Sequence, residues 1–236
     1  MSRLYWSVSS LPSTEEIPAL MHRLADAFPA DASRRYLDAL ITPRTPPGVA
    51  VARLGALSLL PSLLVQGGMD PASVILQRDE RGRPHGYSLT EGATSFDFNV
   101  SHSSGFGLCA LLLGTGRVGV DVEESIPTQR ALPLIRRYCT EGERRLLEPL
   151  SDNEKAQAFT RIWTIREAVG KQMGTGMPLR YDATVLPDGL HMMTGFFLDT
   201  SACLSLCFPL EAAWEEISQG HDHIPILWDG ASICRS

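Results

Sequence analysis

The sequence has few cysteines, no long uninterrupted hydrophobic run and no excess of basic residues. Five cysteines in 236 residues are too few for a small secreted scaffold held by disulfides, and their odd number prevents complete pairing. The most apolar run, residues 54–65, contains Ser58 and Pro61 and is shorter than the roughly 18–20 residues that cross a bilayer. We therefore expect no association with membranes.

Charge and composition exclude further classes. The chain carries 21 Lys and Arg against 27 Asp and Glu, a formal net charge of −6, and because phosphate binding requires a basic surface, nucleic acid is not an expected partner. A hydrophobic content of 44% excludes a disordered chain. The first 15 residues lack the apolar segment of a secretion signal, so the expected location is the cytoplasm.

Hydrophobic periodicity alternates between helical and strand patterns. Helices are expected at residues 17–28, 34–40, 54–64, 141–147 and 152–173, and strands at 4–8, 74–77, 96–100, 106–113, 117–123, 181–186, 190–198 and 203–208. Ser13 followed by Glu16 is the capping-box pattern that begins a helix. Both halves of the chain thus contain helices followed by strands, which suggests two similar α+β halves.

The first candidate site is the Asp121-Val122-Glu123 segment. Side chains at positions i and i+2 of a strand share a face, so both carboxylates point to one side while Val120 and Val122 point to the core. Two carboxylates about 6–7 Å apart repel each other unless a cation lies near them. Their hard oxygens suit Mg²⁺. The alternative is an ordinary solvated strand face.

The second candidate site is residues 163–171, WTIREAVGK, on the expected long helix. Trp163, Glu167 and Lys171 lie four residues apart and share one helix face. Glu167 is a third carboxylate for the Asp121 and Glu123 pair, and Lys171 is available for anionic oxygens. The alternative is a helix-surface ion pair between Glu167 and Lys171, with Trp163 in the core.

The third candidate site is the polar segment at residues 98–105, FNVSHSSG, which connects two expected strands. The hydroxyl of Ser101, the imidazole of His102 and exposed backbone N–H groups form a plausible phosphate-binding loop. A serine nucleophile of the G-x-S-x-G type is not encoded, because that motif is absent. The alternative is a polar turn with no function.

In order and approximate spacing, these three segments resemble the motifs of the 4′-phosphopantetheinyl transferases. The length is similar to that of the larger, monomeric type, which activates carrier proteins of peptide and polyketide synthases. The resemblance implies an α+β fold of two similar halves related by a pseudo-twofold, with coenzyme A bound between them. Residues 1–115 and 116–210 would form the halves, and residues 211–236 an acidic tail.

The resemblance also implies a reaction. The 4′-phosphopantetheine arm of coenzyme A would pass to a serine of an apo carrier protein and release adenosine 3′,5′-bisphosphate. Asp121, Glu123 and Glu167 would hold Mg²⁺ on the pyrophosphate, with Glu167 as base and Lys171 facing the pyrophosphate. The residues that would meet phosphates of coenzyme A are Arg53, Arg83, Ser101, His102, Arg166 and Lys171.

Two departures from the family pattern affect this interpretation. Arg166 stands where the family motif W-x-x-K-E has lysine, and Arg83 stands where the family has lysine in a Gly-Lys-Pro turn. Arginine can clamp a phosphate but cannot accept a proton. If the family's lysine assists proton transfer, Arg166 reduces activity; if it only binds phosphate, the change is tolerated.

The expected partner is an apo acyl or peptidyl carrier protein, which is commonly acidic in this family. Residues 126–150 contain five arginines against three glutamates, so we expect docking near Arg130–Arg145, with a solvated helix pair as the alternative. Two other functions remain open. One is a coenzyme A-binding protein that has lost turnover through Arg166, and the other is a metal-dependent phosphodiesterase acting on coenzyme A.

Overall fold

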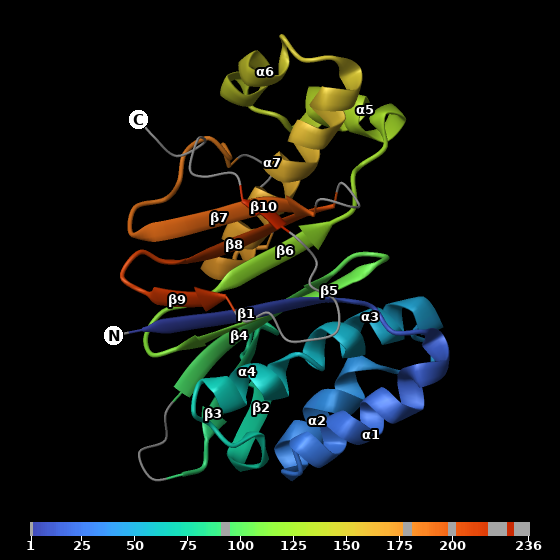
Figure 1. Cartoon of the computed structure of the whole chain (residues 1–236), viewed down its shortest axis with the longest axis vertical. Helices are drawn as coiled ribbons and strands as arrows, with labels where there is room; N and C mark the ends of the chain where they lie inside the picture. Colours follow the sequence, from blue (N-terminus) through green and yellow to red (C-terminus); the bar gives the residue numbers. More distant parts are fainter. Residues whose placement is uncertain (1, 91–94, 177–180, 198–201, 217–225, 229–236) are drawn as a thin grey trace. The chain divides into compact units, whose positions relative to one another are not determined.

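The chain folds into two compact units, each described by itself (Figure 1). The computed structural model describes residues 2–90, 95–176, 181–197, 202–216 and 226–228. Residues 1–118 and 211–223 belong to the first unit, and residues 119–210 and 224–236 to the second. Each unit combines helices with a mainly antiparallel sheet, so the predicted α+β class is confirmed. The pseudo-twofold relation of the halves stays a prediction.

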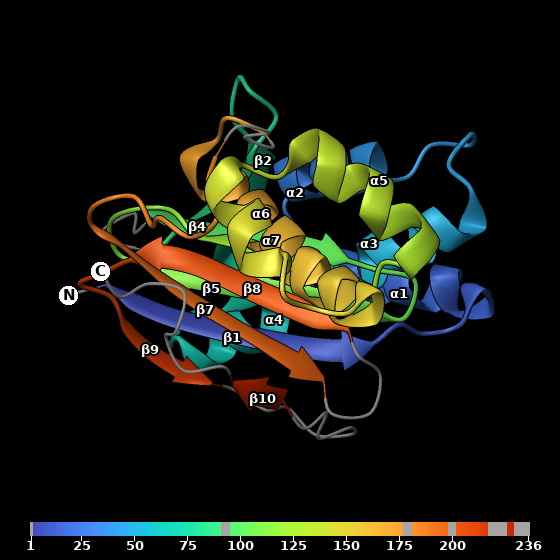
Figure 2. The ribbon, with the colours of Figure 1, turned by 90° about the horizontal axis from the view of Figure 1, so that it is seen from above.

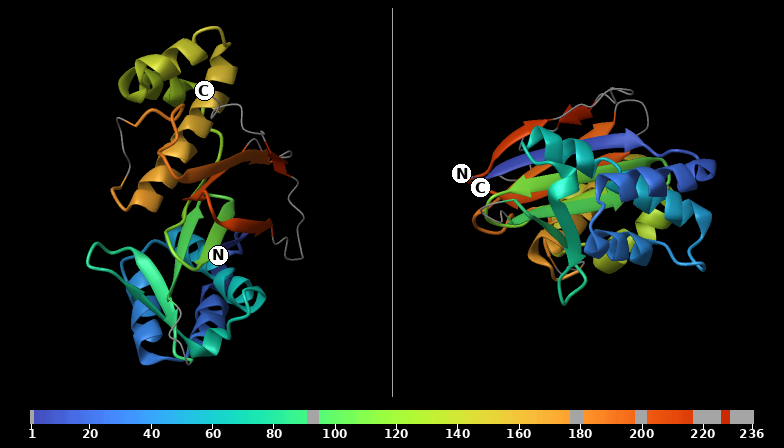
Figure 3. Two further views of the ribbon diagram at one scale, coloured as in Figure 1. Left: turned by 90° about the vertical axis from the view of Figure 1, so that its left-hand side faces the viewer. Right: turned by 90° about the horizontal axis from the view of Figure 1, so that it is seen from below.

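A six-stranded sheet forms the centre of the first unit, in the order β2-β3-β4-β5-β1-β9. Its strands are β1 (Arg3–Ser10), β2 (Val74–Arg78), β3 (Pro84–Ser88), β4 (Ser95–His102), β5 (Phe106–Leu113) and β9 (Ala213–Glu216). Neighbours are antiparallel except β1 and β9, which are parallel. The hairpin of β2 and β3 forms one edge (Figure 3). The first four strands expected from the sequence are confirmed, whereas β3 and β9 were not anticipated.

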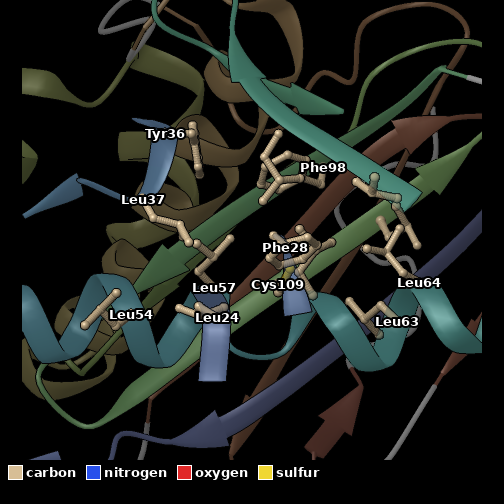
Figure 4. Close-up of a cluster of buried hydrophobic side chains, with 14 of the residues drawn as sticks. Leu24, Phe28, Tyr36, Leu37, Leu54, Leu57, Leu63, Leu64, Phe98 and Cys109 are labelled. Atoms are coloured by element: carbon tan, nitrogen blue, oxygen red, sulfur yellow. The ribbon is translucent and has the colours of Figure 1, made fainter. Parts of the chain in front are cut away.

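Helices of the first unit pack on this sheet and enclose its core (Figure 4). They are α1 (Ile17–Ala27), α2 (Asp31–Leu40), α3 (Pro47–Leu57) and α4 (Leu60–Gln66), with short 3₁₀ turns at Thr14–Glu16 and Pro71–Ser73. The capping box between Ser13 and Glu16 is present as predicted. Leu24 and Phe28 from the α1 region belong to the same buried cluster as Phe98 of β4 and Cys109 of β5, so this cluster holds the helix against the sheet.

The single helix expected at residues 54–64 is wrong, because α3 and α4 are separate helices. Pro61 lies in the first turn of α4, where its missing N–H costs nothing, whereas inside a longer helix its ring would clash with a carbonyl. By length and composition alone the stretch Pro47–Gln66 could cross a membrane, with a mean hydropathy of 1.8. In this structure 56% of its most apolar window is buried within the protein.

A four-stranded sheet, in the order β10-β7-β8-β6, forms the centre of the second unit. Its elements are β6 (Gly119–Glu123), α5 (Thr128–Tyr138), α6 (Glu141–Leu147), α7 (Asp152–Met173), β7 (Leu190–Phe197), β8 (Cys203–Pro209) and β10 (Ile226–Trp228). The long helix α7 lies on β6 and β8, with α5 beside it (Figure 2). The predicted long helix is confirmed with the bounds expected, and it ends at Gly174 in the left-handed conformation (φ 69°).

The strand expected at residues 181–186 is wrong, because this segment forms turns. The carboxylate of Asp182 accepts hydrogen bonds from the backbone N–H and the hydroxyl of Thr184, at 2.9 and 2.5 Å. Such local bonding by aspartate favours a turn over a strand ladder. Apolar residues at Tyr181, Ala183 and Val185 had produced the alternating pattern of a strand.

Candidate active site

The two carboxylates of β6 point toward α7. β6 pairs with β8 so that Asp121 lies opposite Ser205 and Glu123 opposite Cys203. Val120 and Val122, on the other face of the strand, are completely buried. Asp121 is itself 3% exposed, whereas Glu123 is half-buried. The strand alternation that predicted a shared carboxylate face therefore describes the observed strand.

Helix α7 approaches β6 at Gly119. A Cβ atom added to Gly119 would lie 1.9 Å from the carbonyl oxygen of Ala168 and 2.5 Å from the backbone nitrogen of Gln172. These are backbone atoms of the helix, so no side-chain movement could make room. Only glycine allows this approach, and the approach brings Glu167 and Lys171 of α7 alongside the acidic residues of β6.

Lys171 forms an ion pair with Asp121 of β6. Its ammonium donates to Asp121 Oδ1 at 2.7 Å and to the carbonyl oxygen of Val120 at 3.0 Å. The Asp121 side chain is 5% exposed and that of Lys171 28%, so a nearly buried negative charge has a half-buried cation as its partner. The ammonium thus binds Asp121 directly, and its charge also acts on Glu167, the partner in the alternative interpretation.

The three carboxylates influence one another electrostatically. Burial, then the charge of Asp121, raises the pKa of Glu123 to about 7; Lys171 opposes the shift, and Glu167 and Glu124 add to it. Burial and Asp121 also raise the pKa of Glu167, again opposed by Lys171. Negative charge is thus concentrated between β6 and α7, and Lys171 only partly compensates it. A site of this kind attracts a cation.

The raised pKa of Glu123 gives a testable pH dependence. An acid whose pKa is higher in the folded state stabilises the protein below its unfolded value and loses that contribution as pH rises through the folded value. In metal-free buffer, the stability of the wild type relative to Glu123→Gln should therefore fall as pH rises from about 4.5 to about 7. Urea unfolding of both proteins at several pH values measures this difference, and a constant difference would contradict it.

The carboxylates of Asp121, Glu123 and Glu167 are ligands of the kind that a hard divalent cation binds, but in the described residues they are not arranged around one ion position. Three carboxylates offer the oxygen ligands that Mg²⁺ takes. Among the described residues, however, no three His, Cys, Asp or Glu side chains are arranged to surround an ion. Since Lys171 already binds one oxygen of Asp121, a metal ion would have to displace or share this contact.

Arg166, which the family resemblance places at a phosphate of coenzyme A, is buried and bound within the second unit. Its side chain is 1% exposed, and its guanidinium binds Glu143 Oε2 at 2.5 Å and the carbonyl oxygen of Tyr138 at 2.8 Å. Helix α7 turns this side chain away from the half-exposed Glu167 and into the interior. Adjacency to Glu167 in the motif had suggested a shared role, but successive helix residues point in different directions.

Arg83 lies in the first unit and is also engaged within the protein. Its guanidinium binds both carboxylate oxygens of Asp97 and the carbonyl oxygen of Val118, and its side chain is 9% exposed. The backbone N–H of Val118 donates to Asp97 Oδ2 at 2.7 Å. The ion pair therefore holds Val118, the residue after which the chain enters the second unit, to Asp97 of β4. The sequence did not suggest this contact.

The remaining candidates of the first unit lie in different surroundings. Ser101 and His102 end β4, opposite Leu108 and Gly107 of β5, with Ser101 6% exposed and His102 half-buried. In the next residue, Ser103, the side-chain oxygen is buried and has no hydrogen-bond partner within the described part of the chain, which suits a loop that receives a polar ligand. The exposed Arg53 of α3 donates to the carbonyl oxygen of Leu40 at 2.8 Å.

Sequence reasoning missed three residues that shape these surroundings, namely Asp97, Gly119 and Glu143. Glu143 had a visible signal, because Thr140 three residues earlier completes a capping box that the structure contains. Gly119 lies two residues before the Asp121-Val122-Glu123 segment, and the need for glycine there comes from its contact with α7. Asp97 lies in an alternating strand, where a buried carboxylate has no sequence signature until Arg83 is known to be its partner.

Comparison with known proteins covers two of the three candidate segments, those at residues 121–123 and 163–171. The sequence model of the 4′-phosphopantetheinyl transferase superfamily matches residues 117–211. The chain is similar to the 4′-phosphopantetheinyl transferase HetI of Nostoc sp., with 35% identity over 47% of this chain and 46% of the relative. It is also similar to AcpT of Salmonella typhimurium (34% identity, 55% and 65%) and to Sfp of Bacillus subtilis (26%, 49% and 48%). The matched regions span 32% to 65% of the length of these curated relatives.

Proposed function

We propose, from the match of residues 117–211 to the 4′-phosphopantetheinyl transferase superfamily and from the similarity to its curated members, that this chain transfers the 4′-phosphopantetheine arm of coenzyme A to a serine of an apo carrier protein. The observation that carries the proposal is the acidic face of β6 and α7, where Asp121, Glu123, Glu167 and Lys171 meet inside the matched segment. Such a face can bind a cation and, through it, a pyrophosphate.

The proposed reaction is a displacement at phosphorus. The serine oxygen of the carrier forms a bond to the phosphorus that bears pantetheine, the bridging P–O bond of the pyrophosphate breaks, and adenosine 3′,5′-bisphosphate leaves with the bonding electrons. The serine proton goes to a base. As in other phosphoryl transfers, positioning and charge neutralisation supply most of the catalysis.

The residues of β6 and α7 have distinct proposed roles. Asp121, Glu123 and Glu167 would hold Mg²⁺, which would neutralise pyrophosphate oxygens as a Lewis acid when bound. Glu167 would accept the serine proton; in the metal-free protein, burial and the charge of Asp121 raise the pKa of this carboxyl. Lys171 would bind a pyrophosphate oxygen with the ammonium that now binds Asp121.

In the first unit, we assign phosphate contacts to Ser101 and His102 because of the motif and because the buried Ser103 hydroxyl beside them has no hydrogen-bond partner among the described residues. Arg53 is kept as a further candidate because it is exposed. Arg83 and Arg166 are not included, since both guanidinium groups are occupied inside their own units.

The proposed carrier-docking surface lies on α5 and α6. It consists of five exposed arginines, Arg130, Arg136, Arg137, Arg144 and Arg145. The guanidinium of Arg137 lies 5.1 Å from the ring centre of Tyr138, and Arg145 forms an exposed pair with Glu141. Exposed cations on the rim of an interface attract an acidic partner, and they change its association rate more than the stability of the final complex.

Reversal of two of these charges tests the surface. In Arg136→Glu/Arg137→Glu, we expect the KM for an acidic carrier to rise about tenfold or more, while the affinity for coenzyme A stays unchanged. The matched control is Arg34→Glu/Arg35→Glu, because this adjacent pair is equally exposed on α2 and lies outside the proposed surface. An unchanged carrier KM in the first variant, or an equal rise in both, would exclude this surface.

The proposed function itself is tested by following the nucleotide product. With coenzyme A and Mg²⁺, the protein should release adenosine 3′,5′-bisphosphate only when an apo carrier is added. Release without a carrier would indicate a phosphodiesterase, and binding of coenzyme A without any release would indicate a binding protein. Chromatography of the nucleotides, with and without carrier, separates these three outcomes.

A further inference from the structure

The most completely buried ion pair in the described part of the second unit connects α7 to α6. The side chains of Arg166 and Glu143 are 1% and 0% exposed. A buried charge without a partner is strongly destabilising, so each of the two groups requires the other. The pair therefore has a function in the fold that is separate from phosphate binding.

The carboxylate of Glu143 accepts hydrogen bonds from several segments of the second unit. Its Oε2 accepts the bond from Arg166 and another from the backbone N–H of Thr140 at 2.8 Å. Its Oε1 accepts from the backbone N–H of Ala183 at 2.9 Å. The Thr140 hydroxyl in turn donates to Asp182 at 2.6 Å. One carboxylate thus joins the start of α6, helix α7 and the turn at 182–184.

Helix α6 needs such an attachment. It has seven residues, fewer than an isolated helix requires for stability in water. The C-terminal end of α6 packs incompletely on α7, because a pocket of about 260 Å³ lies between them. Its lining includes Leu146, Leu150, Ile162 and Phe196. The buried bond to Arg166 therefore fixes the beginning of α6, where packing of the other end is incomplete.

The same bond fixes the surface proposed for carrier docking. Arg144 and Arg145 directly follow Glu143, and both are exposed. Arg136 and Arg137 form the last turn of α5, directly before Tyr138, whose carbonyl oxygen Arg166 also binds. A change at Arg166 would therefore be transmitted to the positions of cations on both helices.

Arginine suits this position better than the lysine of the family motif. Separate nitrogen atoms of the guanidinium bind Tyr138 and Glu143 at the same time. A lysine ammonium is a compact charge on a flexible stem and lacks this planar, fixed geometry. Lysine would keep the charge opposite Glu143 but hold the two segments less firmly.

We propose that Arg166 is a positioning residue that acts through Glu143 to hold α6 and the end of α5 in the arrangement that receives the carrier protein. This inference rests on the proposed transferase function, because it assigns Arg166 to recognition of the carrier and not of coenzyme A.

Three measurements on Arg166→Lys and Arg166→Met test the inference, at a temperature where both variants are folded. They are the dissociation constant for coenzyme A, the KM for the carrier and backbone hydrogen exchange. We expect the carrier KM to rise about tenfold in Arg166→Lys and further in Arg166→Met, with coenzyme A affinity within about twofold of the wild type. Exchange should accelerate at α6 and at Ala183.

The matched control is Lys155→Met on the same helix, whose partner Asp152 is exposed, with an N–O distance of 3.7 Å; it should change none of the three values. Weaker coenzyme A binding with an unchanged carrier KM would overturn the inference, since Arg166 would then contact the cofactor. Uniformly faster exchange would also overturn it. If the wild type transfers nothing, the proposed function fails separately, and unchanged exchange at α6 would still refute the role of Arg166.

Discussion

Replacement of Gly119 by alanine is expected to destabilise the protein by about 3 kcal/mol or more and to abolish transfer. The added methyl group would overlap the backbone of α7 at Ala168 and Gln172. Because these atoms belong to the helix ladder, the helix itself would have to move away from β6. That movement would separate Glu167 and Lys171 from Asp121, so activity would be lost even in molecules that remain folded.

The control for this variant is Gly48→Ala. Gly48 lies in α3, and an added Cβ there would meet no atom within 4 Å. This substitution should be neutral or stabilising by up to about 1 kcal/mol. Urea unfolding of both variants and the wild type provides the comparison. Equal stability of the Gly119 and Gly48 variants would show that α7 does not rest on β6 as described.

Substitution of Asp121 by asparagine is expected to reduce kcat/KM about 10³-fold while the protein stays folded. Asparagine preserves the shape of the side chain but removes the charge that holds Lys171 at 2.7 Å and raises the pKa of Glu123 and Glu167. The affinity of the acidic face for a divalent cation should fall with it. Calorimetric titration with Mg²⁺ and steady-state kinetics measure the two effects separately.

Asp152→Asn is the matched control, because Asp152 also pairs with a lysine of α7 but is exposed and distant in sequence from the motif. It should leave kcat/KM unchanged. Near-normal activity of Asp121→Asn would remove this residue from the proposed cation site, whatever the effect on stability.

The sequence predicts the acidic face because strand alternation and helix periodicity are local rules. Alternation alone placed Asp121 and Glu123 on one side of β6 with Val120 and Val122 on the other, as observed. The contact between this strand and α7 depends on residues about 50 positions apart. It came from the family resemblance and not from any local pattern.

The roles of the arginines were beyond local rules for a different reason. Arg83 and Arg166 stand at positions where the family motifs have lysine, so the family resemblance suggested phosphate ligands. Arg83 binds Asp97, which follows it by 14 residues. Arg166 binds Glu143, which precedes it by 23 residues. Such pairing is decided by tertiary packing, and only the structure reveals which arginines are occupied.

Two errors in the secondary structure have a similar origin. The apolar run at 54–64 reads as one helix until Pro61 is placed in the first turn of a second helix. The alternating residues at 181–186 read as a strand until the Asp182 side chain is seen to bond its own backbone neighbours. In the acidic tail, Ala213–Glu216 and Ile226–Trp228 add strands to sheets formed much earlier in the chain, a pairing that composition does not reveal.

In the proposed function, the acidic face of β6 and α7 is required for transfer of phosphopantetheine to a carrier protein. Intact-mass spectrometry of an apo carrier, incubated with coenzyme A, Mg²⁺ and either the wild type or Asp121→Asn, tests it most directly. We expect the wild type to add one phosphopantetheine arm to the carrier serine and the variant to leave the carrier almost unmodified. A carrier of unchanged mass with the wild type, or equal modification by both proteins, would contradict it.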